Sequence, residues 1–433
     1  MEKKIGLICC FLFVFNSYAQ KSSFSFKAVD STSYALFLKQ DWKTLIALGK
    51  DAKSEGINFY YLKVRMGIAY FKEGKMLIAM KYLEEAYALN QYDVVVQDYL
   101  YWTYRYTGMF LESDVFYKKM DEELKASLNH KLKIVSAIDV GIVATNNVDY
   151  DALLSESNIS NLYNSRVFPK NYQLYTLGLN HRFSNSTNFY HRITVMPVAL
   201  VLQQNLNNET VNSSFQGTET RYYADATFAL QNKWYLDTYL GLFFGSFDEL
   251  DFTSITPVNV NNKTKYTDVL FGASISKLCY FFRNTANISY SNLGAFDQFQ
   301  VGYTLSLYPF GNTLLVPFGS IQYQNESTGS LNESQLVYTA GLTLNTKNVT
   351  LTGYMNSGEM HNFNSNNGAV IYNQSAIGLN EYGAILRLYL NKTTLKVGYS
   401  FMNMQDYYFS EELIPTTYKF NQQNLIAGFT WNL

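Results

Sequence analysis

The sequence predicts an α-helical N-terminal module followed by an antiparallel transmembrane β-barrel of about 14 strands, with about 12 to 16 as the range. Three observations support this fold class. Apolar and small polar side chains alternate in many segments of residues 131–433. Charged residues are much denser before His130 than after it. Short and long connections alternate between the segments, which is typical of bacterial outer-membrane barrels.

The first 19 residues are typical of a secretory signal, with a lysine pair, an apolar run and a cleavage site after Ala19. The alternatives are a lipoprotein anchored at Cys9 or Cys10, or a retained helical anchor. The apolar stretch before either cysteine is short for a lipoprotein signal. After cleavage only Cys279 remains, so we expect neither an internal disulfide nor a cysteine-based metal site.

Charge divides the rest of the chain in two. Residues 21–130 hold 29 charged side chains in 110 residues, whereas residues 131–433 hold only 37 in 303 residues. The first part therefore reads as a solvated helical domain, residues 20–130, and the second as a segment poor enough in charge to face lipid. The net charge of −1 does not favour nucleic acid as a partner. No stretch after the N-terminus approaches the ~20 apolar residues that a membrane helix needs.

The helical part repeats with a period of 34 residues, because Tyr104 follows Tyr70 and Gly108 follows Gly74 at that distance. Small residues at Gly67 and Ala79 would let two antiparallel helices approach closely. Gly74 would permit the turn between them. The positions that make up this signature are Gly67, Tyr70, Gly74, Ala79, Leu83, Ala86, Tyr104 and Gly108.

Residues 60–92 resemble a tetratricopeptide (TPR) unit at these positions. A second copy, residues 94–124, is degraded, because Tyr101 and Ser113 replace its small residues, and Trp42 marks an upstream half-match. About three units are the minimum for a stable stack. The resemblance implies a groove that binds a segment of a partner protein. The alternative is a helical spacer that orients the barrel.

Alternation of side chains is clearest at the C-terminus. Leu425, Ala427 and Phe429 fall on one face of an extended chain, and the other face is small or polar apart from Ile426. Similar segments recur throughout residues 131–433, which we predict to be an outer-membrane barrel. A soluble sandwich is the alternative, but its outer face would be rich in Lys, Glu and Thr, and this polar face is rich in Gly, Ser, Thr and Gln.

The predicted connections fall into two sets. Tight turns are expected at 185–186, 231–232, 276–277, 311–312, 346 and 391–392, and long loops at 146–169, 205–216, 248–262, 325–333, 356–378 and 403–416. The segment 314–323 is ambiguous because Pro317 interrupts its alternation. With an even number of strands, the first and last residues of the barrel segment both lie on the short-turn side, which is periplasmic in such barrels. The helical domain would therefore be periplasmic.

Charged side chains on the polar face would line the lumen. They are Asp139, Arg192, Asp225, Asp237, Asp268, Arg283, Asp297, Glu381, Arg387 and Lys396. They could form a charged pore lining that selects solutes. They could equally form a paired network that fills and stiffens the interior, and their mixed signs favour neither anions nor cations.

Catalytic chemistry is not predicted. The four histidines lie outside any nucleophile motif, and no G-x-S-x-G, HExxH, CxxC, phosphate loop or calcium loop is present. We therefore predict no enzyme, no cofactor and no metal site. The Asn-rich run that begins at His361 is expected to be a mobile surface loop that could contact sugar.

The layout as a whole resembles a TPR-containing outer-membrane β-barrel protein, with a signal, periplasmic repeats and a terminal barrel. Some members of that group export exopolysaccharide. The first hypothesis is an outer-membrane pore or export component, with outer-membrane lipid around it, a periplasmic protein docked on the repeats, and a solute or glycan in the lumen. The second is a non-conducting anchor for a protein complex, and the third is a lipid-modifying enzyme.

Overall fold

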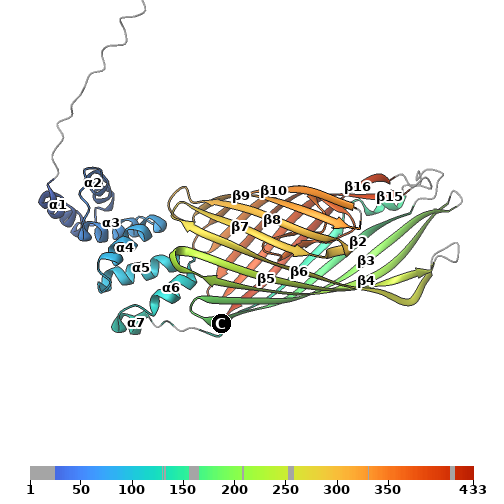
Figure 1. The fold of residues 1–433 in the computed structure, drawn as a ribbon, viewed down its shortest axis with the longest axis horizontal. Helices are drawn as coiled ribbons and strands as arrows, with labels where there is room; N and C mark the ends of the chain where they lie inside the picture. The colour runs from blue at the N-terminus through green and yellow to red at the C-terminus, as the bar shows by residue number, and fades with distance from the viewer. Residues whose placement is uncertain are drawn as a thin grey trace, which may run out of the picture.

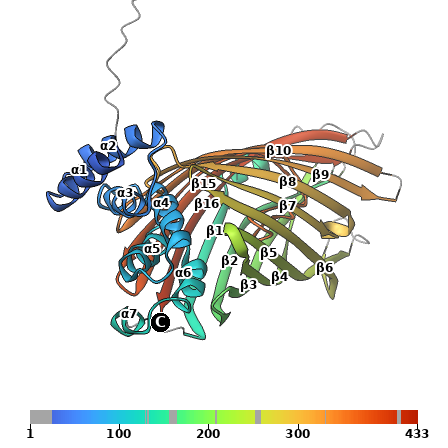
Figure 2. The same ribbon diagram turned by 60° about the vertical axis from the view of Figure 1, so that its left-hand side comes forward.

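The computed structural model describes residues 25–128, 130, 133–155, 165–206, 209–251, 258–329, 331–409 and 415–433. A helical module precedes a long closed barrel, and the helices lie at the barrel end that carries the C-terminus (Figures 1 and 2). The expected signal over residues 1–19 lies outside the described residues.

The module contains three helix pairs and one further helix. They are α1 (Phe26–Leu38), α2 (Trp42–Ser54), α3 (Tyr60–Lys72), α4 (Met76–Leu89), α5 (Val94–Tyr106), α6 (Phe110–Tyr117) and α7 (Glu122–Leu128). The first helices of the pairs begin 34 residues apart, and so do the second helices. Asp41 and Asp93 accept backbone hydrogen bonds at the starts of α2 and α5, which caps these helices. Membership of the TPR family stays a prediction.

The signature positions explain how α3 and α4 pack. Leu83 and Ala79 are fully buried, and a Cβ on Gly67 would lie only 2.7 Å from the Leu83 side chain. Gly74 and Gly108 adopt φ values of +72° and +76° in the turns after α3 and α5, a conformation that glycine adopts without strain. Among the described residues, no helix is long and apolar enough to cross a membrane.

Fourteen strands close the barrel in the order β1-β16-β15-β14-β11-β10-β9-β8-β7-β6-β5-β4-β3-β2. Their bounds are β1 (Val135–Asn147), β2 (Ser165–Ser184), β3 (Thr187–Leu206), β4 (Glu209–Ala229), β5 (Trp234–Asp251), β6 (Val258–Cys279), β7 (Phe282–Ser291), β8 (Asp297–Leu307), β9 (Leu315–Thr328), β10 (Leu331–Asn345), β11 (Val349–Met360), β14 (Ile377–Leu390), β15 (Thr393–Phe409) and β16 (Pro415–Asn432). Smaller elements are α8 (Tyr150–Ser155), η1 (Gln231–Lys233), η2 (Leu293–Ala295), β12 (Phe363–Ser365) and β13 (Val370–Tyr372). All barrel pairs are antiparallel, and Ile142 of β1 pairs with Ala427 of β16 on one side and with Tyr175 of β2 on the other. The predicted fold class and strand number are confirmed.

The outer surface of the barrel is apolar. Leu177, Phe271, Val397 and Leu425 are each between 51% and 62% exposed, although they belong to different strands around the barrel. Such a belt has no stable place in water, but it is what hydrocarbon would solvate. Closure of the sheet also pairs the backbone groups that an open edge would leave exposed to lipid.

The two ends of the barrel differ. Short connections such as 185–186 and 391–392 join adjacent strands at the short-turn end. The connections that alternate with them along the chain join the strands at the long-loop end. The expected turn at 276–277 is wrong, because β6 continues to Cys279 and the turn is at 280–281. The expected loop at 205–216 is also wrong, because β4 begins at Glu209. Pro317 lies within β9, opposite Leu342 of β10 and just beyond the last residue that pairs with β8.

Candidate solute chamber in the barrel lumen

The connection between β11 and β14 folds into the barrel. Residues 361–376, here called the plug loop, contain the small hairpin β12–β13, and Phe363 and Asn364 in it are almost fully buried. The prediction of a mobile surface loop is therefore wrong. The side-chain amides of Asn362, Asn364 and Asn373 donate to residues of the barrel strands, and such partners satisfy buried amides without water.

Hydrogen bonds fasten the plug loop to strands all around the barrel. Tyr372 donates to Glu381 of β14 at 2.7 Å, and Asn364 donates to Ser289 of β7 at 3.0 Å. On the β3 wall, Arg192 donates to the Ala369 carbonyl at 2.7 Å. The plug loop thus lies across the lumen.

An apolar cluster fills the lumen toward the long-loop end. It combines Leu153 of α8 with Phe168, Phe420, Met402 and the plug-loop residue Phe363, all buried. Methionine suits such an irregular contact between a loop and a barrel wall, because its unbranched side chain adapts to its surroundings. Strand and loop side chains therefore form a small core inside the barrel.

A chamber of about 1390 Å³ adjoins this core and is lined by both the plug loop and the barrel strands. Apolar side chains such as Val143, Phe243 and Ile385 share its wall with charged ones. A largely apolar pocket with a few polar groups is the usual form of a site for a small molecule.

Nine of the ten charged residues predicted to face the lumen do so. Asp139 accepts from Tyr190, Asp237 accepts from Thr227 and Ser274, Asp268 accepts from the Gly294 amide, and Arg283 lies over the Tyr235 ring. Arg192, Glu381, Arg387 and Lys396 line the chamber, and Asp225 shares the inner face of β4 with Tyr223.

Asp297 is the exception, and its predicted place in the lumen is wrong. It is exposed and falls on the same face of β8 as Phe299, whereas the inner face carries the buried Gln298 and Gln300. It accepts a hydrogen bond from Tyr290, also on the outer surface. Since Asp297 is the first residue of β8, at the long-loop end, its carboxylate can lie beyond the hydrocarbon.

The inner charges are not a simple network of ion pairs. The described ion pairs inside the lumen join Arg221 with Glu219 and His361 with Glu326. Lys396 lies directly opposite Arg387 on the neighbouring strand. Like charges in that position repel one another.

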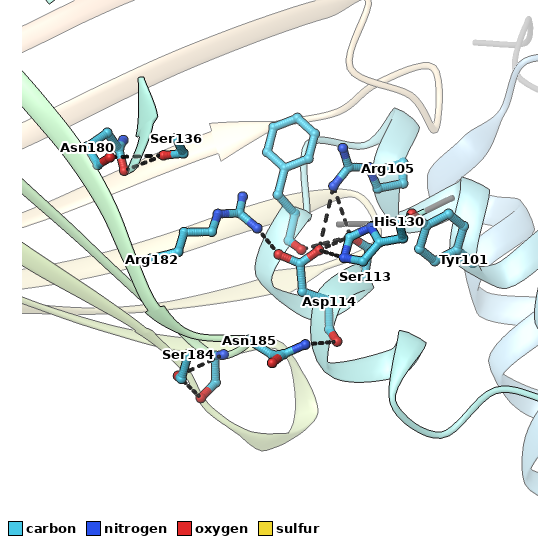
Figure 3. A network of polar contacts seen from close by, with 12 residues as sticks. Tyr101, Arg105, Ser113, Asp114, His130, Ser136, Asn180, Arg182, Ser184 and Asn185 are labelled. Atoms are coloured by element: carbon cyan, nitrogen blue, oxygen red, sulfur yellow. Dashed lines mark hydrogen bonds and ion pairs between the residues drawn. The ribbon is translucent and has the colours of Figure 1, made fainter. Parts of the chain in front are cut away.

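The short-turn end carries a second polar cluster, which sequence reasoning missed. Asp114 of α6 has no exposed side-chain surface and forms an ion pair with Arg182 of β2, with Arg105 and His130 at 3.7 and 3.2 Å (Figure 3). Asn185, in the β2–β3 turn, donates to the Asp114 carbonyl at 2.8 Å. The cluster therefore joins the helical module to the barrel rim.

Protonation of this cluster is set by burial. Burial, with the Arg105 charge as a second cause, lowers the pKa of His130 below its usual 6.5. His130 Nε2 lies 3.2 Å from an Asp114 carboxylate oxygen. Nδ1 lies 3.0 Å from the Tyr101 hydroxyl, which can donate to it when the ring is neutral. Nearby at the same interface, burial raises the pKa of the Glu112 carboxyl.

Further contacts extend the interface around the rim. Glu84 of α4 accepts from Lys233 at 2.6 Å and from Tyr280 at 2.9 Å, two residues from different turns. The Leu77 amide donates to the Gly311 carbonyl at 2.9 Å. The core of the helical module also includes Leu278 and Tyr308 of the barrel. Module and barrel therefore share one core.

No metal site accompanies these clusters within the described part of the chain, where no group of three or more His, Cys, Asp and Glu side chains could hold an ion. Cys279 is a free thiol.

The fold and the site together define the class: a closed β-barrel of the outer-membrane type, with a loop-crossed lumen and a helical module on its short-turn rim. No protein-family model matches the sequence, and no curated protein matches it. Remote structural likenesses exist to outer-membrane barrels.

The toluene transporter TodX of P. putida is similar at 9% identity and a TM-score of 0.44, over 71% of this chain and 92% of that one. A FadL homologue of Pseudomonas aeruginosa is similar at 8% identity and a TM-score of 0.39, over 69% and 90%. A bacterial polysaccharide outer membrane secretin gives 7% identity and a TM-score of 0.35, over 68% and 98%. These values are too low to transfer a function.

Proposed function

We propose that this protein is an outer-membrane β-barrel that passes a small solute through its internal chamber, with its helical module in the periplasm. The observation that carries the proposal is the chamber of about 1390 Å³ beneath a loop held by hydrogen bonds. A protein that served only as an anchor would have no use for such a space. The hydrogen bonds between the plug loop and the barrel wall can be replaced by hydrogen bonds to water or solute. The loop can therefore shift locally to admit a solute.

The solute that suits this lumen is small. The plug loop and the apolar cluster at the long-loop end occupy much of the cross-section that a polymer would need. Polysaccharide or envelope-component secretion would require the loop and α8 to leave the lumen together. A small molecule requires only a local shift of the loop.

The helical module offers a surface for a periplasmic protein. Trp102 and Tyr106 of α5 stack on one another at 5.8 Å between ring centres and are both exposed. Tyr101 and Tyr104, from the same helix, are instead used in the core and in a hydrogen bond to Glu84. The exposed aromatic pair therefore remains for a partner, since such residues often anchor protein interfaces.

Removal of the plug tests solute passage. Phe363 and Tyr372 pair across the β12–β13 hairpin, so a short Gly-Ser linker can replace residues 363–372 without stretching the chain. The matched control inserts the same linker after Gly329, a turn glycine whose added Cβ would meet no atom within 4 Å.

In planar bilayers we expect the loop-replaced protein to conduct several times more ion current than the wild type and the control. Heat-modifiable mobility on gels would confirm that all three barrels are folded. If the folded, loop-replaced barrel passes no current and liposomes containing it do not swell in small sugars, the transport proposal is refuted.

The alternative is a non-conducting anchor for a protein complex. The joint core of module and barrel favours it, because a rigid joint holds a bound partner at a fixed distance from the membrane.

Pull-down with the full-length protein tests partner docking. Trp102→Ala with Tyr106→Ala should lose a periplasmic protein that Tyr92→Ala, another exposed aromatic, retains. Retention of that protein by the double variant would contradict docking at this pair.

A further inference from the structure

One wall of the chamber carries an apolar row across five neighbouring strands. In order around the barrel it consists of Leu174, Val143, Ile426, Gly398 and Ile385, each paired with the next. Ile426 is the exception to the small or polar side chains on the inner face of β16, and in this row it continues the apolar surface between Val143 and Gly398. Gly398 keeps the row open, because a Cβ there would lie 3.2 Å from Ile385.

A basic pair lies beside this row. Arg387 and Lys396 are two residues nearer the short-turn end than Ile385 and Gly398. Their backbone positions are therefore displaced from the apolar row by about 7 Å toward the short-turn end. Gly428 is paired with Lys396, and the stem of the lysine lies over it, because a Cβ there would be 3.2 Å from Lys396 Cε. Arg192 approaches the same position from β3 and lies within electrostatic reach of Lys396.

Two carboxylates of the chamber are bound to groups other than this pair. Glu381 accepts from Tyr372 and Asn356, and Glu219 is paired with Arg221. Asp139 lies within electrostatic reach of Lys396, and its carboxylate accepts a hydrogen bond from Tyr190. The structure gives Arg387 and Lys396 no hydrogen-bond or ion-pair partner among the described residues.

Two further features favour an anion site here. Arg192 is the third cation, and its Nε is buried without a hydrogen-bond partner among the described residues. Arg387 and Lys396 repel one another across the ladder, a cost that a bound anion would offset. A guanidinium beside an ammonium is a common receptor for carboxylate, sulfonate or phosphate groups.

We propose that the chamber binds an amphipathic organic anion, with its charged group on Lys396 and Arg387 and its apolar part on the row of Leu174, Val143, Ile426 and Ile385. This inference rests on the proposed solute passage and names the class of solute. Arg192, which also holds the Ala369 carbonyl of the plug loop, reaches the same anion. Capture of the anion by Arg192 would loosen the loop and link binding to opening.

Titration calorimetry with the full-length protein in lipid nanodiscs tests the site. The probe is 2-naphthoate, and its neutral analogue is 2-naphthylmethanol. We expect 2-naphthoate to bind, and Lys396→Gln or Arg387→Gln each to weaken it about tenfold or more, since each removes a charge-assisted hydrogen bond. Lys392→Gln, an exposed lysine in the adjacent turn, should leave affinity unchanged.

The probe series separates charge recognition from simple burial. Naphthylmethanol should bind at least tenfold more weakly than naphthoate to the wild type, and equally well to the wild type and Lys396→Gln. Equal affinity of the wild type for both probes, or unchanged naphthoate affinity in the Lys396→Gln and Arg387→Gln double variant, would overturn the proposal. Liposome swelling in a neutral sugar is measured in parallel: swelling without naphthoate binding refutes the anion site alone, and no swelling in the loop-replaced barrel refutes solute passage.

Discussion

At the scale of single residues, Asp114 is the side chain on which the joint between helices and barrel depends most. It is fully buried among Arg105, His130 and Arg182. Removal of one member of a buried ion pair leaves the other charges without compensation, which typically costs about 3 kcal/mol or more.

Asp114→Asn should therefore loosen the module without unfolding the barrel. We expect hydrogen exchange in α6 to rise by about a hundredfold, in proportion to that loss of free energy. Exchange in β14 and β15 should stay unchanged. Glu123→Gln, an exposed acid on α7, is the matched control. Equal protection of α6 in wild type and Asp114→Asn would show that the cluster contributes little.

The same cluster predicts a pH dependence. Burial lowers the pKa of His130, so the docked state favours the neutral ring, and protonation favours the undocked state. The stabilisation is complete above the usual value of 6.5 and is lost as the pH falls below it. Exchange of α6 should thus accelerate in mild acid.

His130→Gln should abolish this acid-induced part. The comparison is needed because the raised pKa of Glu112 acts in the opposite direction: its neutral form is favoured in the docked state, so acid strengthens that contact. The difference between wild type and His130→Gln isolates the histidine. An identical acid response in both proteins would rule His130 out.

Residue-level prediction from the sequence worked where a pattern had a physical cause. Nine lumen charges followed from alternation within strands, and Asp297 failed because alternation had placed it on the Phe299 face from the start. The contacts of Asp114 could not be predicted. They join residues of different elements, and a single buried carboxylate leaves no periodic signal.

At the scale of elements, Gly358 marks the point at which β11 leaves the wall toward the plug loop. Its φ is +129°, and a Cβ would lie 2.2 Å from the Leu336 carbonyl oxygen. The register of the β11–β14 pair shifts in the same place. Only glycine fits this bulge without strain.

Gly358→Ala should destabilise the plug loop by about 2 kcal/mol or more through backbone strain and the clash. The variant barrel should show faster proteolysis within residues 361–376 and a larger bilayer current. Gly353→Ala is the matched control, because it lies in the same strand and its Cβ would meet no atom within 4 Å. Wild-type protection of the plug loop in Gly358→Ala would contradict this role.

Element boundaries show where sequence patterns lose information. Strands β3 and β4 extend into the expected loop at 205–216. The sequence misses this because outside the hydrocarbon both faces of a strand meet water and the alternation of side chains fades. The plug loop was misplaced for a related reason. A polar lumen accepts the same asparagines that a solvated loop would carry, so composition alone does not distinguish the two.

At the scale of the whole molecule, the fold class was predictable and the assembly was not. Period-two alternation and alternating connection lengths have one physical cause, a sheet with lipid outside and a polar lumen inside. The 34-residue spacing of helix starts was also visible in the sequence. Docking of the module depends on isolated pairs such as Glu84 with Lys233, which come from distant parts of the chain.

The account depends on one claim, that the face of β16 bearing Leu425, Ala427 and Phe429 is solvated by hydrocarbon. The direct measurement is a nitroxide scan of residues 424–430, one label at a time, in lipid bilayers with Cys279 replaced by Ser. Oxygen accessibility should alternate, high at Leu425, Ala427 and Phe429 and low at Asn424 and Ile426. Loss of the alternation, or labels at the three outward positions that water-soluble relaxants reach as readily as oxygen, would contradict the transmembrane barrel.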